Sequence, residues 1–326
     1  MSEEIGSLRH EVSALYGIKI HALNIVVDGV NTTFSVDAEE GCFFLRLYRS
    51  IGRSYSDIEF EHQALIEFPN SEHVNVSKPV KDKSGQTVCR VNYKGDLRLA
   101  ALFTAATGEK PALTVDVARL FGTSLACFHE KMAGFEGKTK RHLPGIAHYI
   151  NDINRTKPEI VSELNKDGQL SKLVESENWL RNRASAYQSE QFCHGDAWIG
   201  NIHVDAETVT FFDLDDCGMG SPLYDVATFA WWMLRTKSDP GFFKAFKDSY
   251  LHDKQQEALN FSDLPFFVVK NEIRALTFLV TYNLLDETML KGAIDGADLL
   301  IKKYFSGHEP LVPAEGNPPE ISGVYK

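Results

Sequence analysis

The stretch from Phe192 to Asp225 constrains the fold of this chain more than any other segment does. It contains an aspartate, Asp196, then an asparagine five residues later, Asn201, and a second aspartate after twelve more residues, Asp213. A short apolar run precedes each aspartate, which predicts strands that end in loops. Such loops can hold a carboxylate in an exposed position while a rigid scaffold fixes its place. We therefore expect a mixed fold whose strand ends carry the chemistry.

Two apolar runs between Asn201 and Asp213, residues 202–204 and 209–212, predict a hairpin with its turn at 205–207. A hairpin would bring Asn201 and Asp213 to the same end, where a hard cation such as Mg²⁺ prefers amide and carboxylate oxygens. Asp196 would then accept or orient the proton of an attacking hydroxyl. One such carboxylate beside an Asn/Asp metal pair is the pattern that phosphoryl transfer from ATP requires.

Two other interpretations of this stretch remain open. In the first, the motif is only structural, because a lone His-Gly-Asp occurs in many turns and a lone aspartate after an apolar run often only caps a strand. In the second, the protein is a metallohydrolase, which would use a different set of ligands from the same stretch: His194, Asp196, His203, Asp213, Asp215 and Asp216. However, the chain has no HExxH or similar ligand pair, and His203 falls within a predicted strand.

The segments His194-Gly-Asp-Ala-Trp-Ile-Gly-Asn201 and Phe212-Asp213-Leu-Asp-Asp, followed by Pro222-Leu-Tyr-Asp225, resemble the aminoglycoside phosphotransferase and choline kinase family. The resemblance implies a bilobal, protein-kinase-like α+β fold and transfer of the ATP γ-phosphate to an alcohol, with Mg²⁺ as the metal. It makes Asp196 and His194 the catalytic candidates, with His194 supporting the loop. It makes Asn201 and Asp213 the metal ligands.

Residues 1–104 are predicted to form the smaller, β-rich lobe, with strands at 18–27, 31–36 and 42–48. The turn before the second strand would cover the phosphates and includes Asn31, although no GxGxxG or Walker sequence occurs. The resemblance places Arg46 where the family has a lysine that contacts the α- and β-phosphates. It matches Glu61, in a helix expected at 54–68, to the family glutamate that pairs with this cation.

Arginine at position 46 departs from the family pattern. It stays charged and can hold a phosphate with two hydrogen bonds, but it is longer and planar, so it is not equivalent to lysine. A non-catalytic nucleotide-binding protein therefore remains an alternative. In another alternative Arg46 faces solvent on an edge strand, and Arg49 or another cation takes its role.

Further strands are expected at 74–80, 87–93 and 97–103, and the last leads into a hinge whose backbone would bind adenine. The candidates there are Phe103, Thr104 and Ala105. Residues 105–305 are predicted to form a helical lobe that binds the substrate, and residues 306–326 a Pro- and Gly-rich tail.

Two residues of the predicted helical lobe stand out. Asp225 falls near a helix N-terminus, where it suits the helix dipole and can hold the catalytic loop. Arg274 lies within an apolar helix, so we expect it to pair with an acid.

Length, composition and charge limit the domain organisation, the partners and the location that we expect. A length of 326 residues suits two lobes, and 43% hydrophobic with 24% charged residues is typical of a globular protein. The net charge of −11 argues against a nucleic-acid partner. Five cysteines without CxxC spacing, and no signal-like or membrane-spanning run, lead us to expect a cytoplasmic protein without a membrane partner.

The acceptor stays open at this point. We expect a small hydroxyl metabolite or an aminoglycoside-like compound. The alternative is the Ser/Thr side chain of a protein. Three features look most like the bacterial stress-response Ser/Thr kinase branch of the family: the Arg46-Leu-Tyr-Arg49 run, the Glu61-His-Gln63 that follows it and the Asp213-Leu-Asp-Asp216 loop.

Overall fold

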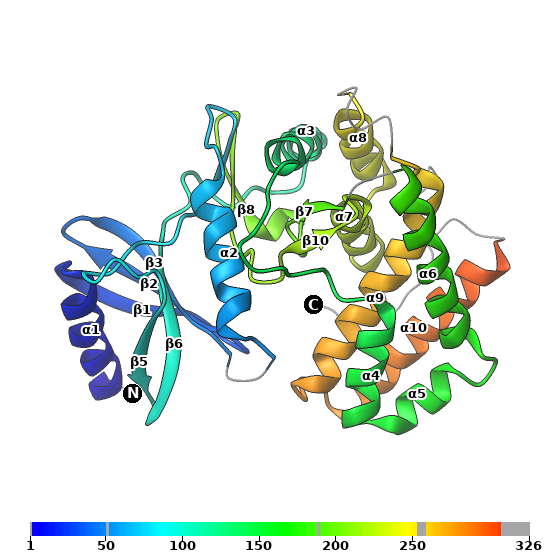
Figure 1. Ribbon diagram of the computed structural model, residues 1–326, viewed down its shortest axis with the longest axis horizontal. Coiled ribbons are helices and arrows are strands. Elements are labelled where there is room, and N and C mark those ends of the chain that lie inside the picture. The colour runs from blue at the N-terminus through cyan, green and yellow to red at the C-terminus, as the bar shows by residue number, and fades with distance from the viewer. Residues whose placement is uncertain (1, 50–51, 188–189, 253–258, 308–326) are drawn as a thin grey trace. The chain divides into compact units, whose positions relative to one another are not determined.

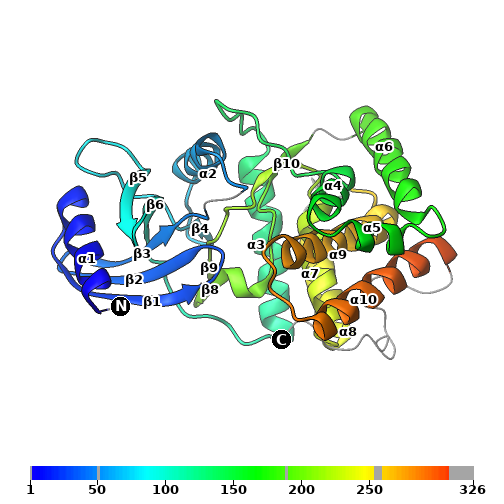
Figure 2. The ribbon, with the colours of Figure 1, turned by 90° about the horizontal axis from the view of Figure 1, so that it is seen from below.

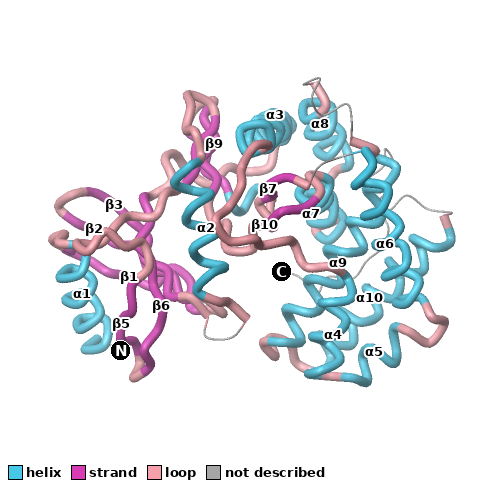
Figure 3. Tube along the Cα trace, in the orientation of Figure 1, coloured by secondary structure: helices cyan, strands magenta, loops and turns pink. Residues whose placement is uncertain are grey.

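The computed structural model describes residues 2–49, 52–187, 190–252 and 259–307 (Figure 1). Backbone contacts divide the chain into two compact units, which we describe one at a time. The first comprises Met1–Glu109, Glu136–Arg141 and His203–Asp215, and the second comprises Lys110–Phe135, His142–Ile202 and Asp216–Lys326. Figure 3 shows strands concentrated in the first unit and helices in the second, so the predicted α+β class is confirmed. A lobe boundary at residue 104 stays a prediction, and the tail beyond residue 307 lies outside the described residues.

The first unit is built on a five-stranded antiparallel sheet in the order β1-β2-β3-β6-β5. Its strands are β1 (Ile20–Asp28), β2 (Thr32–Ala38), β3 (Gly41–Leu47), β5 (Cys89–Tyr93) and β6 (Asp96–Thr104). Helices α1 (Ser2–Tyr16) and α2 (Tyr55–Glu67) lie on opposite sides of this sheet in Figure 1. Leu8 and Val12 of α1 pack on Leu45 and Leu47 of β3 in one apolar core. Because side chains alternate along a strand, this packing turns Arg46 to the face that α2 covers.

Helix α2 begins with a reciprocal cap. The Ser54 hydroxyl accepts a hydrogen bond from the Asp57 amide at 3.2 Å, and the Asp57 carboxylate accepts one from the Ser54 amide at 2.9 Å. This capping box satisfies two amides that the first turn leaves without partners. It fixes the start of the helix and thereby the position of Glu61, two turns later.

The predicted hairpin is present as β8 (Ile202–Asp205) and β9 (Thr208–Phe211). Strand β4 (Val74–Val76) joins it in parallel beside β9, and it is shorter than the strand expected at 74–80. Gly108 lies against this hairpin so closely that a Cβ there would be 2.2 Å from the Val204 carbonyl oxygen. This position therefore requires glycine, and the hairpin is joined tightly to the chain that follows β6.

The second unit is mainly helical, with helix α9 at its centre. Helix α9 contacts α4, α7 and α10, as Figure 2 also shows. Its helices are α3 (Val115–Met132), α4 (Ile146–Thr156), α5 (Pro158–Leu164), α6 (Gln169–Tyr187), α7 (Leu223–Arg235), α8 (Pro240–Tyr250), α9 (Leu264–Thr281) and α10 (Glu287–Ser306). A short ribbon of β7 (Gln191–Cys193) and β10 (Gly218–Gly220) carries the loop that begins at His194. None of the described helices is long and apolar enough to cross a lipid bilayer.

Candidate active site

In the first unit, Arg46 binds two carboxylates. Its Nη1 lies 2.8 Å from Glu61 Oε1, and its Nη2 lies 2.9 Å from Asp213 Oδ1. The guanidinium carbon also lies 4.9 Å from the centre of the Phe103 ring. The Arg46 side chain is only 10% exposed, so the predicted pair with Glu61 is present and the solvent-facing alternative for Arg46 is wrong.

The surroundings of Arg46 keep it charged. Burial alone would lower the pKa of Arg46, but Glu61 and Asp213 outweigh it and raise this pKa well above its usual value. The Tyr48 hydroxyl lies 3.3 Å from Glu61 Oε2 and 2.9 Å from His62 Nε2. Burial, together with the nearby Arg46 cation, lowers the pKa of His62 to about 3. This imidazole is therefore neutral, and Arg46 is the cation of the network.

Asp213 has an unusual backbone conformation. Its φ of 62° lies in the left-handed region, which a residue with a Cβ adopts at a cost of about 1–3 kcal/mol. Its side chain is 47% exposed. Such strain is common where a fold must present a functional group, and here it presents the carboxylate that the sequence assigned to a metal.

Asp215 has a different role from its neighbour. Its Oδ2 accepts hydrogen bonds from Asn31 Nδ2 at 2.8 Å and Arg49 Nη2 at 3.1 Å, and it lies 3.3 Å from Arg53 Nη2. The Asp215 carbonyl oxygen accepts a further bond from Arg141 Nη2 at 2.6 Å. This carboxylate ties the β1–β2 turn to the segment that follows Asp213. The sequence analysis did not predict the partners Arg53 and Arg141, although Arg49 and Arg53, close together after β3, could have indicated an anionic partner.

Part of the backbone that we predicted to bind adenine is already hydrogen-bonded within the protein. The Thr104 amide donates to the Lys78 carbonyl at 2.9 Å, and the Thr104 hydroxyl accepts from the Lys78 amide at 2.9 Å. Adenine recognition by Thr104 and Ala105 would therefore depend on the Thr104 carbonyl and on the backbone after it. These assignments, and that of Phe103, stay predictions.

In the second unit, the loop from His194 to Asp196 is held from behind by Asp225. Asp225 is fully buried in the first turn of α7, and its carboxylate accepts bonds from the amides of His194 at 2.7 Å and Gly195 at 2.9 Å. His129 Nε2 lies 2.9 Å from the same carboxylate. Asp225 therefore occupies the loop-holding position that the sequence suggested.

Gly195 allows the loop to pass close to its neighbour. Its φ is 84°, and a Cβ there would lie 2.0 Å from the Asp216 carbonyl oxygen. The His194 ring is completely buried, and its Nδ1 accepts from the Asp196 amide at 3.3 Å. His194 therefore supports the loop from the inside, whereas the Asp196 side chain is 29% exposed.

Asn201 is oriented by Asp196. Its Nδ2 donates to the Asp196 carbonyl at 2.9 Å and to Asp196 Oδ2 at 3.0 Å. With its donor end engaged in this way, the Asn201 side chain keeps its carbonyl oxygen as an acceptor, and its role as a metal ligand stays a prediction. Arg274 Nη2 reaches the other oxygen of Asp196, Oδ1, at 2.6 Å, so the predicted pairing of Arg274 with an acid is confirmed.

The metallohydrolase alternative finds no support. Asp215 is bound by arginines, and His194 is buried under the loop. Among the described residues, His129, Cys193 and Asp225 have metal-ligating atoms that all lie within 4.8 Å of one another. This group is fully buried, and burial, followed by the nearby Asp225, raises the pKa of the Cys193 thiol.

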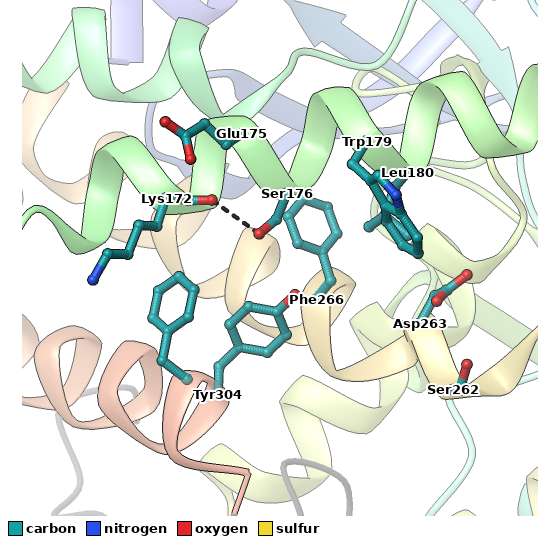
Figure 4. Close-up of a pocket in the computed structure, with 10 residues that line it drawn as sticks. Lys172, Glu175, Ser176, Trp179, Leu180, Ser262, Asp263, Phe266 and Tyr304 are labelled. Carbon is teal, nitrogen blue, oxygen red and sulfur yellow. Dashed lines mark hydrogen bonds between the residues drawn. The ribbon is translucent and has the colours of Figure 1, made fainter.

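A pocket between three helices of the second unit has a different character. Figure 4 shows this pocket of about 390 Å³, lined by Trp179, Phe266 and Tyr304 from α6, α9 and α10. No residue of the 194–201 loop lines it.

Comparisons with known proteins identify relatives of this chain. The chain is 25% identical over 275 residues to an uncharacterized protein of Deinococcus radiodurans, covering 82% of this chain and 79% of that one. It is 24% identical over 230 residues to an uncharacterized protein of Synechocystis, covering 68% of this chain. That match spans 62% of the Synechocystis protein, less than two thirds of its length.

Solved structures share the fold at low sequence identity. An amicoumacin kinase in complex with AMP-PNP, Ca²⁺ and amicoumacin has a TM-score of 0.73 at 17% identity, covering 96% of this chain and 98% of that one. A microcompartment-associated aminopropanol kinase has a TM-score of 0.70 at 20% identity, covering 92% and 97%. The predicted protein-kinase-like fold is thus confirmed. A family model described as "Phosphotransferase enzyme family" matches residues 25–259, and the chain therefore belongs to this family of phosphotransferases.

Proposed function

We propose that the protein transfers the γ-phosphoryl group of ATP to a hydroxyl of a small molecule. The observation that carries this proposal is the loop of the second unit, in which buried residues hold one partly exposed carboxylate, Asp196, beside Asn201. A carboxylate so presented suits the orientation of an attacking hydroxyl.

The donor set suits Mg²⁺. We assign Asn201 and Asp213 as its ligands, because an amide oxygen and a carboxylate oxygen are hard ligands of the kind Mg²⁺ prefers. Asn201 turns its amide nitrogen to Asp196, and the Asp213 side chain is 47% exposed. When bound, Mg²⁺ would neutralise charge on the β- and γ-phosphates.

The residues of this chain would then divide the work. Arg46, fixed by Glu61, would bind the α- and β-phosphates, and Asn31 would hold the covering turn in place. Asp196 would accept a hydrogen bond from the acceptor hydroxyl and take its proton as the oxygen attacks in line. His194 and Asp225 would keep the loop in position without contacting the substrate.

A small-molecule acceptor is favoured over a protein. The solved structures with the same fold are, by their names, kinases of amicoumacin and aminopropanol, and a spectinomycin phosphotransferase shares the fold with a TM-score of 0.55. Nothing in these comparisons supports a protein Ser/Thr acceptor. The non-catalytic alternative is also weakened, because Arg46 keeps the pairing with Glu61 that the family lysine would make.

The test is transfer of label from γ-labelled ATP, with Mg²⁺, to a panel of amino alcohols, aminoglycosides and a generic protein. We expect label on a small molecule, and a loss of about 10²–10⁴-fold in kcat for Asp196→Asn and Asp213→Asn. Asp205→Asn, at the exposed hairpin turn, is the matched control and should keep full activity. ATP binding without transfer to any acceptor would contradict the proposal, and so would normal activity in Asp196→Asn.

A further inference from the structure

Arg274 projects from α9 to the exposed face of the catalytic loop. Its Nη2 lies 2.6 Å from Asp196 Oδ1, and its Nη1 lies 3.3 Å from Asp216 Oδ2. We propose that Arg274 is a positioning residue for phosphoryl transfer, which holds Asp196 by Oδ1 so that Oδ2 meets the acceptor hydroxyl. This inference rests on the proposed function, and nothing in the family match assigns a role to Arg274.

The two oxygens of Asp196 have different partners. Oδ1 accepts the short, charge-assisted bond from Arg274, whereas Oδ2 accepts a longer bond of 3.0 Å from the neutral amide of Asn201. An ionised carboxylate has about four lone-pair sites, so these two bonds fix its plane and leave room for a hydroxyl. Two bonds at opposite oxygens prevent rotation of the group, which a single partner would allow.

Arg274 is anchored on both sides of the loop. Asp216, its second partner, belongs to the segment whose carbonyl packs against Gly195. The guanidinium therefore connects the loop of Asp196 to the segment beneath it. Asp196, Tyr224 and Asp216 together outweigh burial and raise the pKa of Arg274 well above its usual value, so the cation is permanent.

The position of Arg274 is costly for the fold. Its neighbours on α9, Ile273 and Leu276, are completely buried in the apolar core, and Arg274 Nε is buried with no hydrogen-bond partner among the described residues. A buried donor without a partner costs about 1–3 kcal/mol, and an apolar residue in such a place is often at least as stabilising. In this position the arginine contacts two carboxylates, Asp196 and Asp216, whose side chains are 29% and 35% exposed. An ion pair that served stability alone would not need such exposed partners.

A second arginine in the same unit provides the contrast. Arg235 of α7 pairs with Glu272 of α9, and the two side chains are 3% and 0% exposed. This pair joins α7 to α9 inside the core, and its partner is a buried carboxylate that is not part of the loop of Asp196. Substitution of Arg235 therefore reports a loss of packing without a change at Asp196.

The experiment uses ATP hydrolysis with water as the acceptor, since the natural acceptor is unidentified. Arg274→Ala should lower kcat about 100-fold, because misplacement of a reacting group by about 1 Å costs this much, while KM for ATP changes by less than about threefold. Arg274→Lys should recover part of kcat. Guanidinium ion at low concentration should raise the rate of Arg274→Ala several-fold and leave Arg235→Ala unchanged.

The outcomes separate the two claims. A wild-type kcat in Arg274→Ala, beside an inactive Asp196→Asn, would overturn the inference and leave the proposed function intact. An equal loss of kcat per folded molecule in Arg235→Ala, with no guanidinium rescue of Arg274→Ala, would also overturn it. Hydrolysis by the wild type no faster than by Asp196→Asn would remove the proposed function and the inference together.

Discussion

Substitution of Asp225 by asparagine tests how far the catalytic loop depends on one buried carboxylate. Asp225 accepts bonds from the amides of His194 and Gly195 at 2.7 and 2.9 Å, and His129 Nε2 lies 2.9 Å from it. An asparagine has the same shape, but only one of its two terminal atoms can accept. Its amino group would face at least one N–H donor, so one or two buried donors would lose their partner.

The magnitude follows from these contacts. Each buried donor left without a partner costs about 1–3 kcal/mol, and the lost charge at the start of α7 adds about 0.3–1 kcal/mol. We therefore expect Asp225→Asn to lower the free energy of unfolding by about 2–4 kcal/mol and the melting temperature by about 5–10 °C. Because Asp196 directly follows Gly195, we also expect kcat to fall about 100-fold.

Thermal melting and steady-state phosphoryl transfer, both at a temperature where the variant is folded, measure these effects. Asp286→Asn is the matched control, because Asp286 caps α10 through the Met289 amide at 2.8 Å on the surface. It should change stability by less than about 1 kcal/mol and leave kcat unchanged. If Asp225→Asn melted like the wild type and kept kcat within twofold, the loop would not depend on this carboxylate.

Three further predictions concern the buried groups around the site. Arg46→Lys should keep ATP affinity within about tenfold in calorimetry, whereas Arg46→Met should lose about 3–5 kcal/mol of stability, because it leaves a buried carboxylate without its cation. The pKa of His62 is about 3 in the folded state and about 6.5 when unfolded, so the unfolded chain binds the proton first. Stability from His62 is present above pH 6.5 and is lost toward pH 3, by up to about 1.4 kcal/mol per pH unit. Unfolding at a series of pH values should show this slope in the wild type and in the exposed control His10→Gln, and a flatter slope in His62→Gln. Gly195→Ala should destabilise the protein by about 1–3 kcal/mol and lower kcat, because its Cβ would meet the Asp216 carbonyl oxygen at 2.0 Å; a fully active Gly195→Ala would show that the loop can shift.

The resemblance to the family predicted the parts of the site that lie within one element. It assigned Arg46 and Glu61 as a pair, and the structure agrees with the periods of the two elements: Arg46 alternates with Leu45 and Leu47 along β3, and Glu61 is buried on α2. The role of Asp225 was predicted from its place near the start of a helix. The period of a strand or helix, which the sequence carries directly, is consistent with each of these positions.

The missed contacts join segments far apart in the chain. Arg141 reaches the Asp215 carbonyl from 74 residues away, and Arg274 reaches Asp196 from 78 residues away. The apolar pattern of α9 showed that Arg274 needs an acid, but only the packing of α9 against α7 decides which acid it faces. The truncation of the strand expected at 74–80 has a similar cause, because β4 lasts only as long as β9 runs beside it.

The two aspartates that we propose to act in phosphoryl transfer, Asp196 and Asp213, have similar electrostatic surroundings. Arg46 lies between Asp213 and Glu61, and Arg274 lies between Asp196 and Asp216, so each guanidinium joins one of these aspartates to a second carboxylate. Arginine suits this task because its two terminal nitrogens point apart in a rigid plane and can bind two acids at once, whereas lysine offers a single nitrogen. Arg46 therefore joins α2 to the segment after β9, a role that a lysine at this position would fill less well. On this argument Arg46→Lys loses the bond to Asp213 before the bond to Glu61, since Glu61 is the more deeply buried partner, at 1% against 47% exposed.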